Sequence, residues 1–169
     1  LRYFTVYGPG QRPDMAFTRF ITAAVQGREL QIFGSGEQVR DFTYVDDVVD
    51  ANLLAATSDV RPGVVLNVAG GSHTTVNQVL AILEELTDST LERRHNDGVA
   101  GDVQKTGGDT RAIRSALGWE PSISLRDGLA RQGAIARGRL AIGHEVHPVG
   151  RGDARGEPAQ PGVLQVLRR

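Results

Sequence analysis

The sequence predicts an α/β fold, and two observations lead to this class. Short segments rich in aromatic and β-branched residues, typical of strands, alternate along the chain with segments whose apolar residues recur at helical spacing. No internal repeat is visible. With 169 residues, of which 40% are hydrophobic, the chain is long enough for one domain with a buried core.

The first elements are a strand and a helix. Residues 1–7, LRYFTVY, are rich in aromatic and β-branched residues and stop at a Gly-Pro-Gly loop, which predicts a strand. From Phe17 the apolar residues fall at i, i+3, i+4, i+7 and i+8, so we expect an amphipathic helix that ends at Gly27. Two short strands are expected next, at residues 30–33 and 41–45.

The middle of the chain continues the alternation. Asp46 or Asp47 is expected to cap a helix, whose predicted buried stripe is Val48, Val49, Leu53 and Ala56. Residues 64–68 have the near-continuous apolar character of a strand buried on both faces. Thr75 and Gln78 have the spacing of a capping box at the start of the following helix.

The last elements are shorter. Residues 90–95 are a further strand candidate, Asp109 is expected to start a helix closed by Gly118, and Ser124 with Asp127 is expected to open another helix. Beyond them the chain is rich in glycine, arginine and proline and lacks apolar periodicity. We therefore expect one structured region, residues 1–132, followed by a disordered or out-of-frame tail, residues 133–169.

Composition excludes several classes of function. The net charge of -1 argues against nucleic acid or an anionic membrane as a partner. The absence of cysteine rules out disulfides and thiolate metal sites and fits a cytoplasmic location. The four histidines do not pair with carboxylates at the spacing of a metal site, so no metal is expected. No apolar run reaches membrane-spanning length, and no glycine group fits a dinucleotide fingerprint.

Residues 34–48, GSGEQVRDFTYVDDV, place Arg40 just before an expected helix. A guanidinium offers a planar fork of donors that fits phosphate oxygens. The alternative is a solvated arginine on a strand, paired with Asp41 or Asp46. These residues alone leave both interpretations open.

Four segments, taken together, carry a resemblance to a known family. They are LRYFTVYGPGQRPDMAFTRFI, IFGSGEQVRDFTYVDDVVDA, LNVAGGSHTTVNQVL and GDVQKTGGDTRAIRSALGWEP, in this order. The chain resembles the second half of the NAD-dependent epimerase/dehydratases, which are extended short-chain dehydrogenase/reductases acting on nucleotide sugars. The UDP-glucose 4-epimerase branch is the most similar. The resemblance implies a Rossmann-type fold: the last sheet strands plus a small α/β substrate domain, without the NAD-binding half.

The resemblance also implies roles for individual residues. Arg40 would reach the diphosphate of a UDP-sugar, and Asp102 would hold the ribose hydroxyls. Phe4 would lie against the nicotinamide of NAD. The other implied substrate contacts are Thr5, where the family usually has asparagine, and Ala16, Phe17, Ile32, Phe33 and Asn67. The family usually has an arginine where this chain has Val99, so one phosphate contact is expected to be missing.

The catalytic tyrosine–lysine pair of the family does not occur in this sequence. Its only lysine is Lys105, and no tyrosine lies four residues before it. No catalytic residue is therefore assigned, and we expect a UDP-sugar-binding portion of a 4-epimerase that is inactive alone. A portion of a 4,6-dehydratase or decarboxylase, or a non-catalytic relic, is the alternative. The family is usually homodimeric, but most of its dimer helices would be missing here.

Overall fold

The computed structural model describes residues 1–98 and 101–141 of the chain. The structure is α/β, as predicted, with short strands and five helices in this part. The helices are α1 (Ala16–Gln26), α2 (Val45–Thr57), α3 (Val76–Thr87), α4 (Arg111–Leu117) and α5 (Leu125–Ala141). The strands are β1 (Arg2–Tyr3), β2 (Val6–Tyr7), β3 (Leu30–Phe33), β4 (Val39–Arg40), β5 (Thr43–Tyr44), β6 (Asn67–Val68), β7 (Thr74–Thr75) and β8 (Arg93–Asn96).

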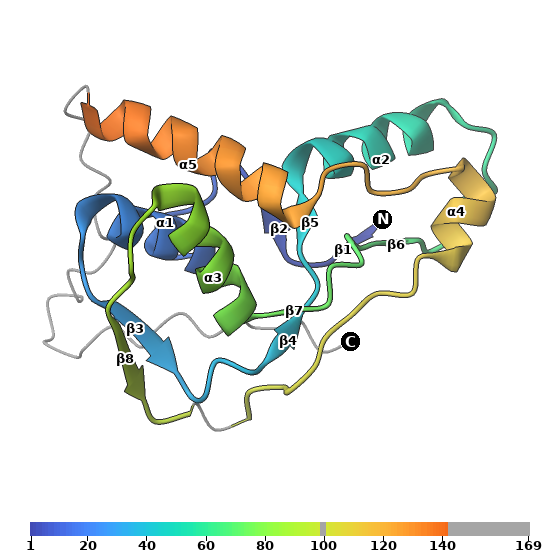
Figure 1. The fold of residues 1–169 in the computed structure, drawn as a ribbon. Helices are drawn as coiled ribbons and strands as arrows, with labels where there is room; N and C mark the ends of the chain where they lie inside the picture. Colours follow the sequence, from blue (N-terminus) through green and yellow to red (C-terminus); the bar gives the residue numbers. More distant parts are fainter. Residues whose placement is uncertain (99–100, 142–169) are drawn as a thin grey trace, which may run out of the picture.

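The strands form four two-stranded pairs. β1 pairs with β6, β2 with β5, and β3 with β8, all in parallel, whereas β4 and β7 are antiparallel. In Figure 1, β3 and β8 lie below α1 and α3, α5 crosses above these two helices, and α2 and α4 lie at the other end of the molecule. Each parallel pair joins segments far apart in the sequence, which is typical of an α/β fold.

Two hydrophobic clusters stabilise this arrangement. The larger cluster lies where α1, α3 and α5 meet β3 and contains Phe17, Ile21, Ile32, Leu80 and Leu129. The smaller cluster joins α2, α4 and β6 through Ala51, Leu66, Val68, Ile113 and Trp119. The larger cluster fixes the helix and strands that carry most of the predicted site residues.

The local capping signals are confirmed. The Thr75 side chain accepts from the Gln78 amide while the Gln78 side chain accepts from the Thr75 amide, which is a complete capping box. Gly27 and Gly118 end α1 and α4 in the left-handed conformation, with φ of 61° and 64°. Ser124 accepts from the amide of Asp127 at the start of α5.

The first predicted strand is divided in two. β1 and β2 flank Phe4 and Thr5 because the chain changes its hydrogen-bonding partner there. The Phe4 amide still donates to the carbonyl of Val68 in β6, whereas the Thr5 carbonyl already accepts from the amide of Thr43 in β5. The prediction of one continuous strand over 1–7 was therefore wrong, and Thr5 lies at the change of partner.

The predicted buried stripe of α2 was wrong at Val49, Leu53 and Ala56, which are exposed, whereas Val48 packs against the smaller core cluster. Tyr44 is the N-cap, with no side-chain cap, and Asp46 and Asp47 lie in the first turn. Asp47 and Ala51 are the buried residues of α2, whereas Val49 and Leu53 are 50% and 59% exposed. The reason is that the Asp47 carboxylate faces inward, where it accepts hydrogen bonds from the segment at residues 122–123.

Other predicted boundaries differ from the structure: the strands expected at 41–45 and 90–95 are Thr43–Tyr44 and Arg93–Asn96, and the helix expected from Asp109 begins at Arg111. β6 contains only Asn67–Val68, and Val64 and Val65 are exposed rather than buried on both faces. α5 continues to Ala141, past the expected boundary at residue 132, because Gly133 is buried and Ala136 packs against the larger core cluster. The rest of the predicted tail, residues 142–169, lies outside the described residues.

Candidate functional site

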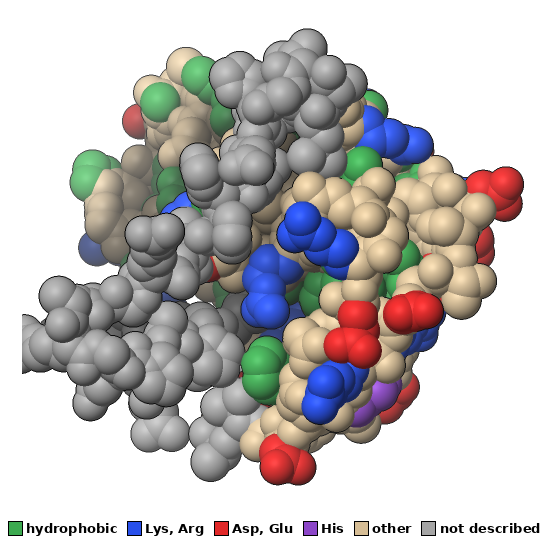
Figure 2. Space-filling view, turned by 90° about the vertical axis from the view of Figure 1, so that its left-hand side faces the viewer, with side chains coloured by type: hydrophobic (Ala, Val, Ile, Leu, Met, Phe, Trp, Pro, Cys, Tyr) green, Lys and Arg blue, Asp and Glu red, His purple; other side chains and the backbone are tan. Residues whose placement is uncertain are grey.

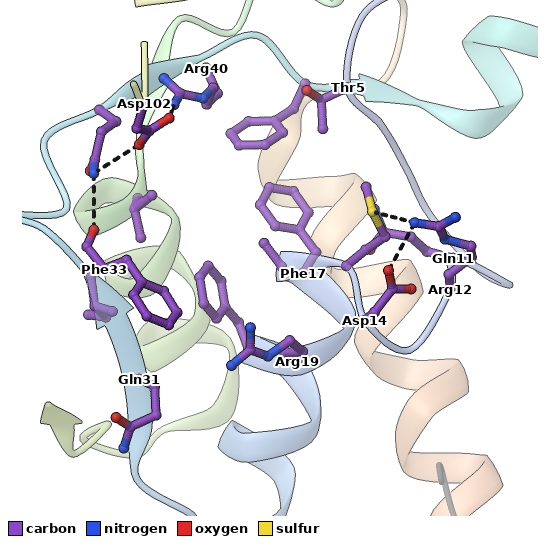
Figure 3. Close-up of a pocket in the computed structure, with 17 residues that line it drawn as sticks. Thr5, Gln11, Arg12, Asp14, Phe17, Arg19, Gln31, Phe33, Arg40 and Asp102 are labelled. Atoms are coloured by element: carbon purple, nitrogen blue, oxygen red, sulfur yellow. Dashed lines mark hydrogen bonds and ion pairs between the residues drawn. The ribbon is translucent and has the colours of Figure 1, made fainter. Parts of the chain in front are cut away.

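A pocket of about 210 Å³ lies between α1, β3, β4 and the segment that contains residue 102. Figure 3 shows its lining: Arg40 and Asp102 lie at one end, and Phe33 and Phe17 lie on opposite sides. The lining residues are Thr5, Gln11, Arg12, Asp14, Met15, Ala16, Phe17, Arg19, Phe20, Gln31, Ile32, Phe33, Gln38, Arg40, Phe42, Val76 and Asp102. They combine aromatic faces with charged groups, a composition that suits a ligand with both an apolar ring and polar groups.

Arg40 is held rigidly at the pocket wall. It is 6% exposed, and its Nη1 donates to the carbonyl of Val39 at 3.0 Å. Its Nη2 donates to Oδ1 of Asp102 at 2.6 Å, and the Asp102 side chain is 29% exposed. The guanidinium is therefore oriented by the strand that carries it and by a carboxylate that lies in the same pocket.

The two ion-pair partners considered from the sequence are engaged elsewhere. The Asp41 carboxylate is fully buried and accepts from the amides of Gly71 at 2.7 Å and Gly108 at 3.3 Å. Asp46 pairs with Arg131 at 3.7 Å. The alternative of a solvated arginine paired with Asp41 or Asp46 was therefore right that Arg40 forms an ion pair, but wrong about its partner and about its exposure to solvent.

The aromatic lining comes from the larger core cluster. Phe17 and Phe42 are in tilted contact, with ring centroids 4.4 Å apart, and both are buried. Phe33 is only partly buried, so part of its ring remains available to a ligand. Ile32 is 2% exposed and belongs to the core, so its lining contribution is small.

The start of α1 brings backbone donors to the pocket. Met15, Ala16 and Phe17 all line it, and Met15 caps α1 without a side-chain hydrogen bond. The first amides of a helix have no partner within the helix. Within residues 1–98 and 101–141, the structure shows no acceptor for the amides of Ala16 and Phe17. Two donors therefore remain available at this wall.

Most of the predicted site residues line this pocket, but two of them do not. Thr5, Ala16, Phe17, Ile32, Phe33, Arg40 and Asp102 line it. Asn67 lies on β6, where its side-chain amide donates to the carbonyl of Asp109 at 3.1 Å. Phe4 is partly buried, with its ring close to Gly108. The structure thus separates Phe4 and Asn67 from the group around Arg40.

Gln38 was missed by the sequence analysis. It is 9% exposed, and its side-chain amide donates to the carbonyl of Phe33 at 3.0 Å and to Asp102 at 3.4 Å. It therefore links the aromatic end of the pocket to the carboxylate. Gln38 lies between the two strands expected at residues 30–33 and 41–45, so the strand pattern gave no signal for it. Arg12, Asp14 and Arg19 were also missed, since they lie in a loop and on an exposed helix face.

Acid–base chemistry is not concentrated in this pocket. Burial, followed by the charge of Asp47, raises the pKa of Tyr7 well above its ordinary value, so its phenol stays protonated at neutral pH. Tyr7 lies in the core rather than in the pocket lining. Hydrogen bonds from Arg111 lower the pKa of Asp109 to about 2, and this pair is exposed on the surface. The arrangement is suited to binding and orienting a ligand.

Among the residues that the structure describes, no group of three or more His, Asp or Glu side chains could hold a metal ion, and no helix in that part is long and apolar enough to cross a membrane. For a dinucleotide, only Phe4 was expected to contribute, and it does not line the pocket.

The described residues on the face drawn in Figure 2 give it a mixed charge. Figure 2 shows Lys and Arg side chains interspersed with Asp and Glu side chains on this face, with hydrophobic side chains among them. An anionic ligand would thus meet individual basic side chains rather than a broad positive field. The fold and pocket together define an α/β protein with a candidate site for an anionic, ring-containing ligand.

Comparison with known proteins identifies the family. Residues 1–69 match the model of the NAD dependent epimerase/dehydratase family. A UDP-glucuronate 4-epimerase from Thermodesulfobacterium geofontis is 38% identical over 134 residues, which is 78% of this chain and 40% of the relative. Over the matched residues the chain belongs to the NAD dependent epimerase/dehydratase family, and this confirms the resemblance inferred from the four segments.

Solved structures confirm the fold. UDP-glucuronic acid 4-epimerase from Bacillus cereus, in complex with UDP-glucuronic acid and NAD, matches with a TM-score of 0.78 at 35% identity, covering 81% of this chain and 44% of that chain. UDP-glucose 4-epimerase from Thermotoga maritima, solved with UDP-glucose, matches with a TM-score of 0.75 at 40% identity, covering 83% and 45%. The family is NAD-dependent, and this chain spans less than half the length of these relatives.

Proposed function

We propose that this chain is the UDP-sugar-binding, C-terminal portion of an NAD-dependent sugar 4-epimerase. The observation that carries the proposal is the convergence of Arg40, Asp102 and Phe33 on one pocket. These residues come from three separate segments, and each supplies a group that a nucleoside diphosphate needs: a cation, a hydrogen-bond acceptor and an aromatic face. Several relatives are named as UDP-glucose or UDP-glucuronate epimerases, which supports the same ligand class.

The proposed ligand position follows from this arrangement. The uracil ring stacks on Phe33, and the free amides of Ala16 and Phe17 are donors for its carbonyl oxygens. Asp102 accepts from the ribose hydroxyls, and Arg40 donates to the diphosphate. Thr5, where β1 gives way to β2, supplies a hydroxyl toward the sugar.

The proposal includes no catalytic residue on this chain. A sugar epimerase of this family needs a base, and an ordinary tyrosine, with a pKa near ~10, needs a neighbouring positive charge to act as one. Because this sequence contains no Tyr-x-x-x-Lys pair, we expect the 169-residue chain to be inactive when incubated with UDP-glucose and NAD. Formation of UDP-galactose would overturn that part of the proposal.

Calorimetric titration of the 169-residue chain with UDP tests the binding proposal. Wild type is expected to bind UDP, and Arg40→Ala is expected to lose most of the affinity. Arg28→Ala is the matched control, because Arg28 is exposed and lies outside the pocket. Arg40→Lys keeps the positive charge without the planar fork and should retain intermediate affinity, and thermal unfolding shows whether each variant is folded. A folded wild-type chain that does not bind UDP would contradict the proposal.

A further inference from the structure

Gln38 and Arg40 hold the two oxygens of the Asp102 carboxylate. The Arg40 guanidinium donates to Oδ1 at 2.6 Å, and the side-chain amide of Gln38 donates to Oδ2 at 3.4 Å. Oδ1 accepts a short, charge-assisted hydrogen bond, whereas Oδ2 accepts only the longer one. Because the Asp102 side chain is 29% exposed and lines the pocket, Oδ2 is the oxygen with more acceptor capacity left for a ligand hydroxyl.

The orientation of the Gln38 carboxamide is fixed by its neighbours. Its NH2 group donates to the carbonyl of Phe33 at 3.0 Å as well as to Asp102. Since both of these neighbours are acceptors, only the NH2 side of the amide can face them. Gly34 leaves the space for this arrangement, because a Cβ atom there would lie 2.9 Å from Nε2 of Gln38. One side chain thus connects the strand that carries Phe33 to the carboxylate proposed to meet the ribose.

Stability alone does not account for this side chain. Gln38 is 9% exposed, and its Oε1 atom is buried without a hydrogen-bond partner among the described residues. A buried acceptor that loses water without gaining a donor destabilises the folded state. An apolar residue of the same length would avoid that cost, so the benefit of glutamine lies in the two groups that its NH2 holds.

We propose that Gln38 is a positioning residue that keeps the Asp102 carboxylate directed at the 2′-hydroxyl of the ligand, so that the pocket selects ribonucleoside over 2′-deoxyribonucleoside diphosphates. This inference rests on the proposed function, because it assumes that Asp102 meets the ribose. A carboxylate held at both oxygens does not have to be ordered when the ligand binds, so the hydroxyl contributes more to the affinity. Without Gln38, only Arg40 restrains the carboxylate, and part of the selection is lost.

Calorimetric titration with UDP and 2′-deoxy-UDP tests this on wild type, Gln38→Met, Gln38→Glu and Gln26→Met. Wild type should bind UDP roughly tenfold more tightly than 2′-deoxy-UDP, because the deoxy ligand lacks one hydrogen bond to a carboxylate. Gln38→Met keeps the length of the side chain but removes its donor, so the ratio should fall to roughly threefold. Gln38→Glu places an acceptor against two acceptors and should lower the ratio at least as far. Gln26 is exposed and lies outside the pocket, so Gln26→Met should keep the wild-type ratio.

A merely structural role of Gln38 would give a different result. General loosening of the pocket would weaken both ligands by the same factor and leave their ratio unchanged. The melting temperature of Gln38→Met should stay close to that of wild type, since removal of the unpaired Oε1 offsets the lost donor. A second measurement needs no variant: saturating UDP should shift the side-chain amide NMR signals of Gln38 more than saturating 2′-deoxy-UDP does.

The outcomes separate this inference from the proposed function. An unchanged ratio in folded Gln38→Met, with wild type binding UDP, overturns the role of Gln38 and leaves the proposed function standing. Equal affinity of wild type for the two ligands overturns the selection of ribose, and equal shifts of the Gln38 amide signals overturn its contact with the hydroxyl through Asp102. Failure of folded wild type to bind UDP overturns both the inference and the proposed function.

Discussion

The Nη2 atom of Arg40 lies 2.6 Å from Oδ1 of Asp102, although the two residues are 62 positions apart in the sequence. This ion pair joins β4 to the segment that closes the pocket. Hydrogen bonds between the backbone of Val39 and residues 104 and 106 hold the same segment in place. Arg40, the main candidate in this pocket for binding phosphate, is therefore already paired with the carboxylate of Asp102.

Removing the charge of Asp102 should make Arg40 more available to anions. In Asp102→Asn the guanidinium loses its neutralising partner, so the affinity for inorganic pyrophosphate, which has no ribose, should rise several-fold over wild type. Isothermal titration with pyrophosphate measures this effect. Asp97→Asn is the control, because Asp97 is exposed and does not line the pocket. Equal pyrophosphate affinity in wild type and Asp102→Asn would show that the ion pair does not limit anion binding.

Replacing Phe33 should affect the base rather than the phosphates. Stacking of a base on an aromatic ring contributes about 1–3 kcal/mol, so Phe33→Ala should weaken UDP and uridine by the same factor. Tyr3→Ala is a matched aromatic control, since Tyr3 is 51% exposed and lies outside the pocket. Titration of both variants with the two ligands gives the comparison. A loss for UDP alone would contradict the proposed position of the uracil.

Asp47 should be important for stability. Its buried carboxylate accepts from the Ser122 amide and hydroxyl and from the Ile123 amide, and its backbone carbonyl accepts from the indole of Trp119. Asp47→Ala leaves the amides of Ser122 and Ile123 and the hydroxyl of Ser122 without this acceptor, so the free energy of unfolding should fall by about 3 kcal/mol. Urea unfolding followed by the fluorescence of Trp119, the only tryptophan, measures it.

The adjacent aspartate provides the control for that experiment. Asp46 is largely exposed and is 3.7 Å from Arg131, so Asp46→Ala should change the free energy of unfolding by less than about 0.5 kcal/mol. Equal effects of the two substitutions would mean that the hydrogen bonds of Asp47 do not stabilise the fold.

Glu84 should make stability depend on acidic pH. The hydrogen bond from the Leu91 amide, at 2.9 Å, and the interaction with Arg93 lower the pKa of Glu84 below its usual 4.5. A lowered pKa in the folded state means that the stabilisation is present above pH 4.5 and is lost as the pH falls through the folded value. The stability difference between wild type and Glu84→Gln should thus shrink on acidification, as measured by urea unfolding at several pH values. The exposed Glu85, replaced by Gln, is the control, and a difference that grows on acidification would contradict this assignment.

The sequence predicted local structure better than long-range contacts. The capping box of Thr75 and Gln78 and the C-cap at Gly27 depend on residues a few positions apart, and the structure confirms both. The buried stripe of α2 was predicted incorrectly because apolar spacing favoured Val49 and Leu53. The buried face instead includes Asp47, whose partners at residues 122–123 cannot be inferred from local periodicity.

The same distinction applies to the site. Arg40, Asp102 and Phe33 were assigned through a family resemblance, and the structure places all three in one pocket. The ion pair between Arg40 and Asp102 depends on tertiary structure, and the local alternatives Asp41 and Asp46 were the partners that sequence proximity suggested. Asn67 was assigned through the same resemblance, but its side chain contacts the backbone of Asp109 instead of lining the pocket.

A crystal structure of the chain with UDP tests the central claim most directly. The account predicts a diphosphate within hydrogen-bonding distance of the Arg40 guanidinium, with the uracil ring against Phe33 and the ribose hydroxyls at Asp102. UDP bound outside this pocket, or bound inside it with Arg40 contacting only Asp102 and Val39, would contradict the account.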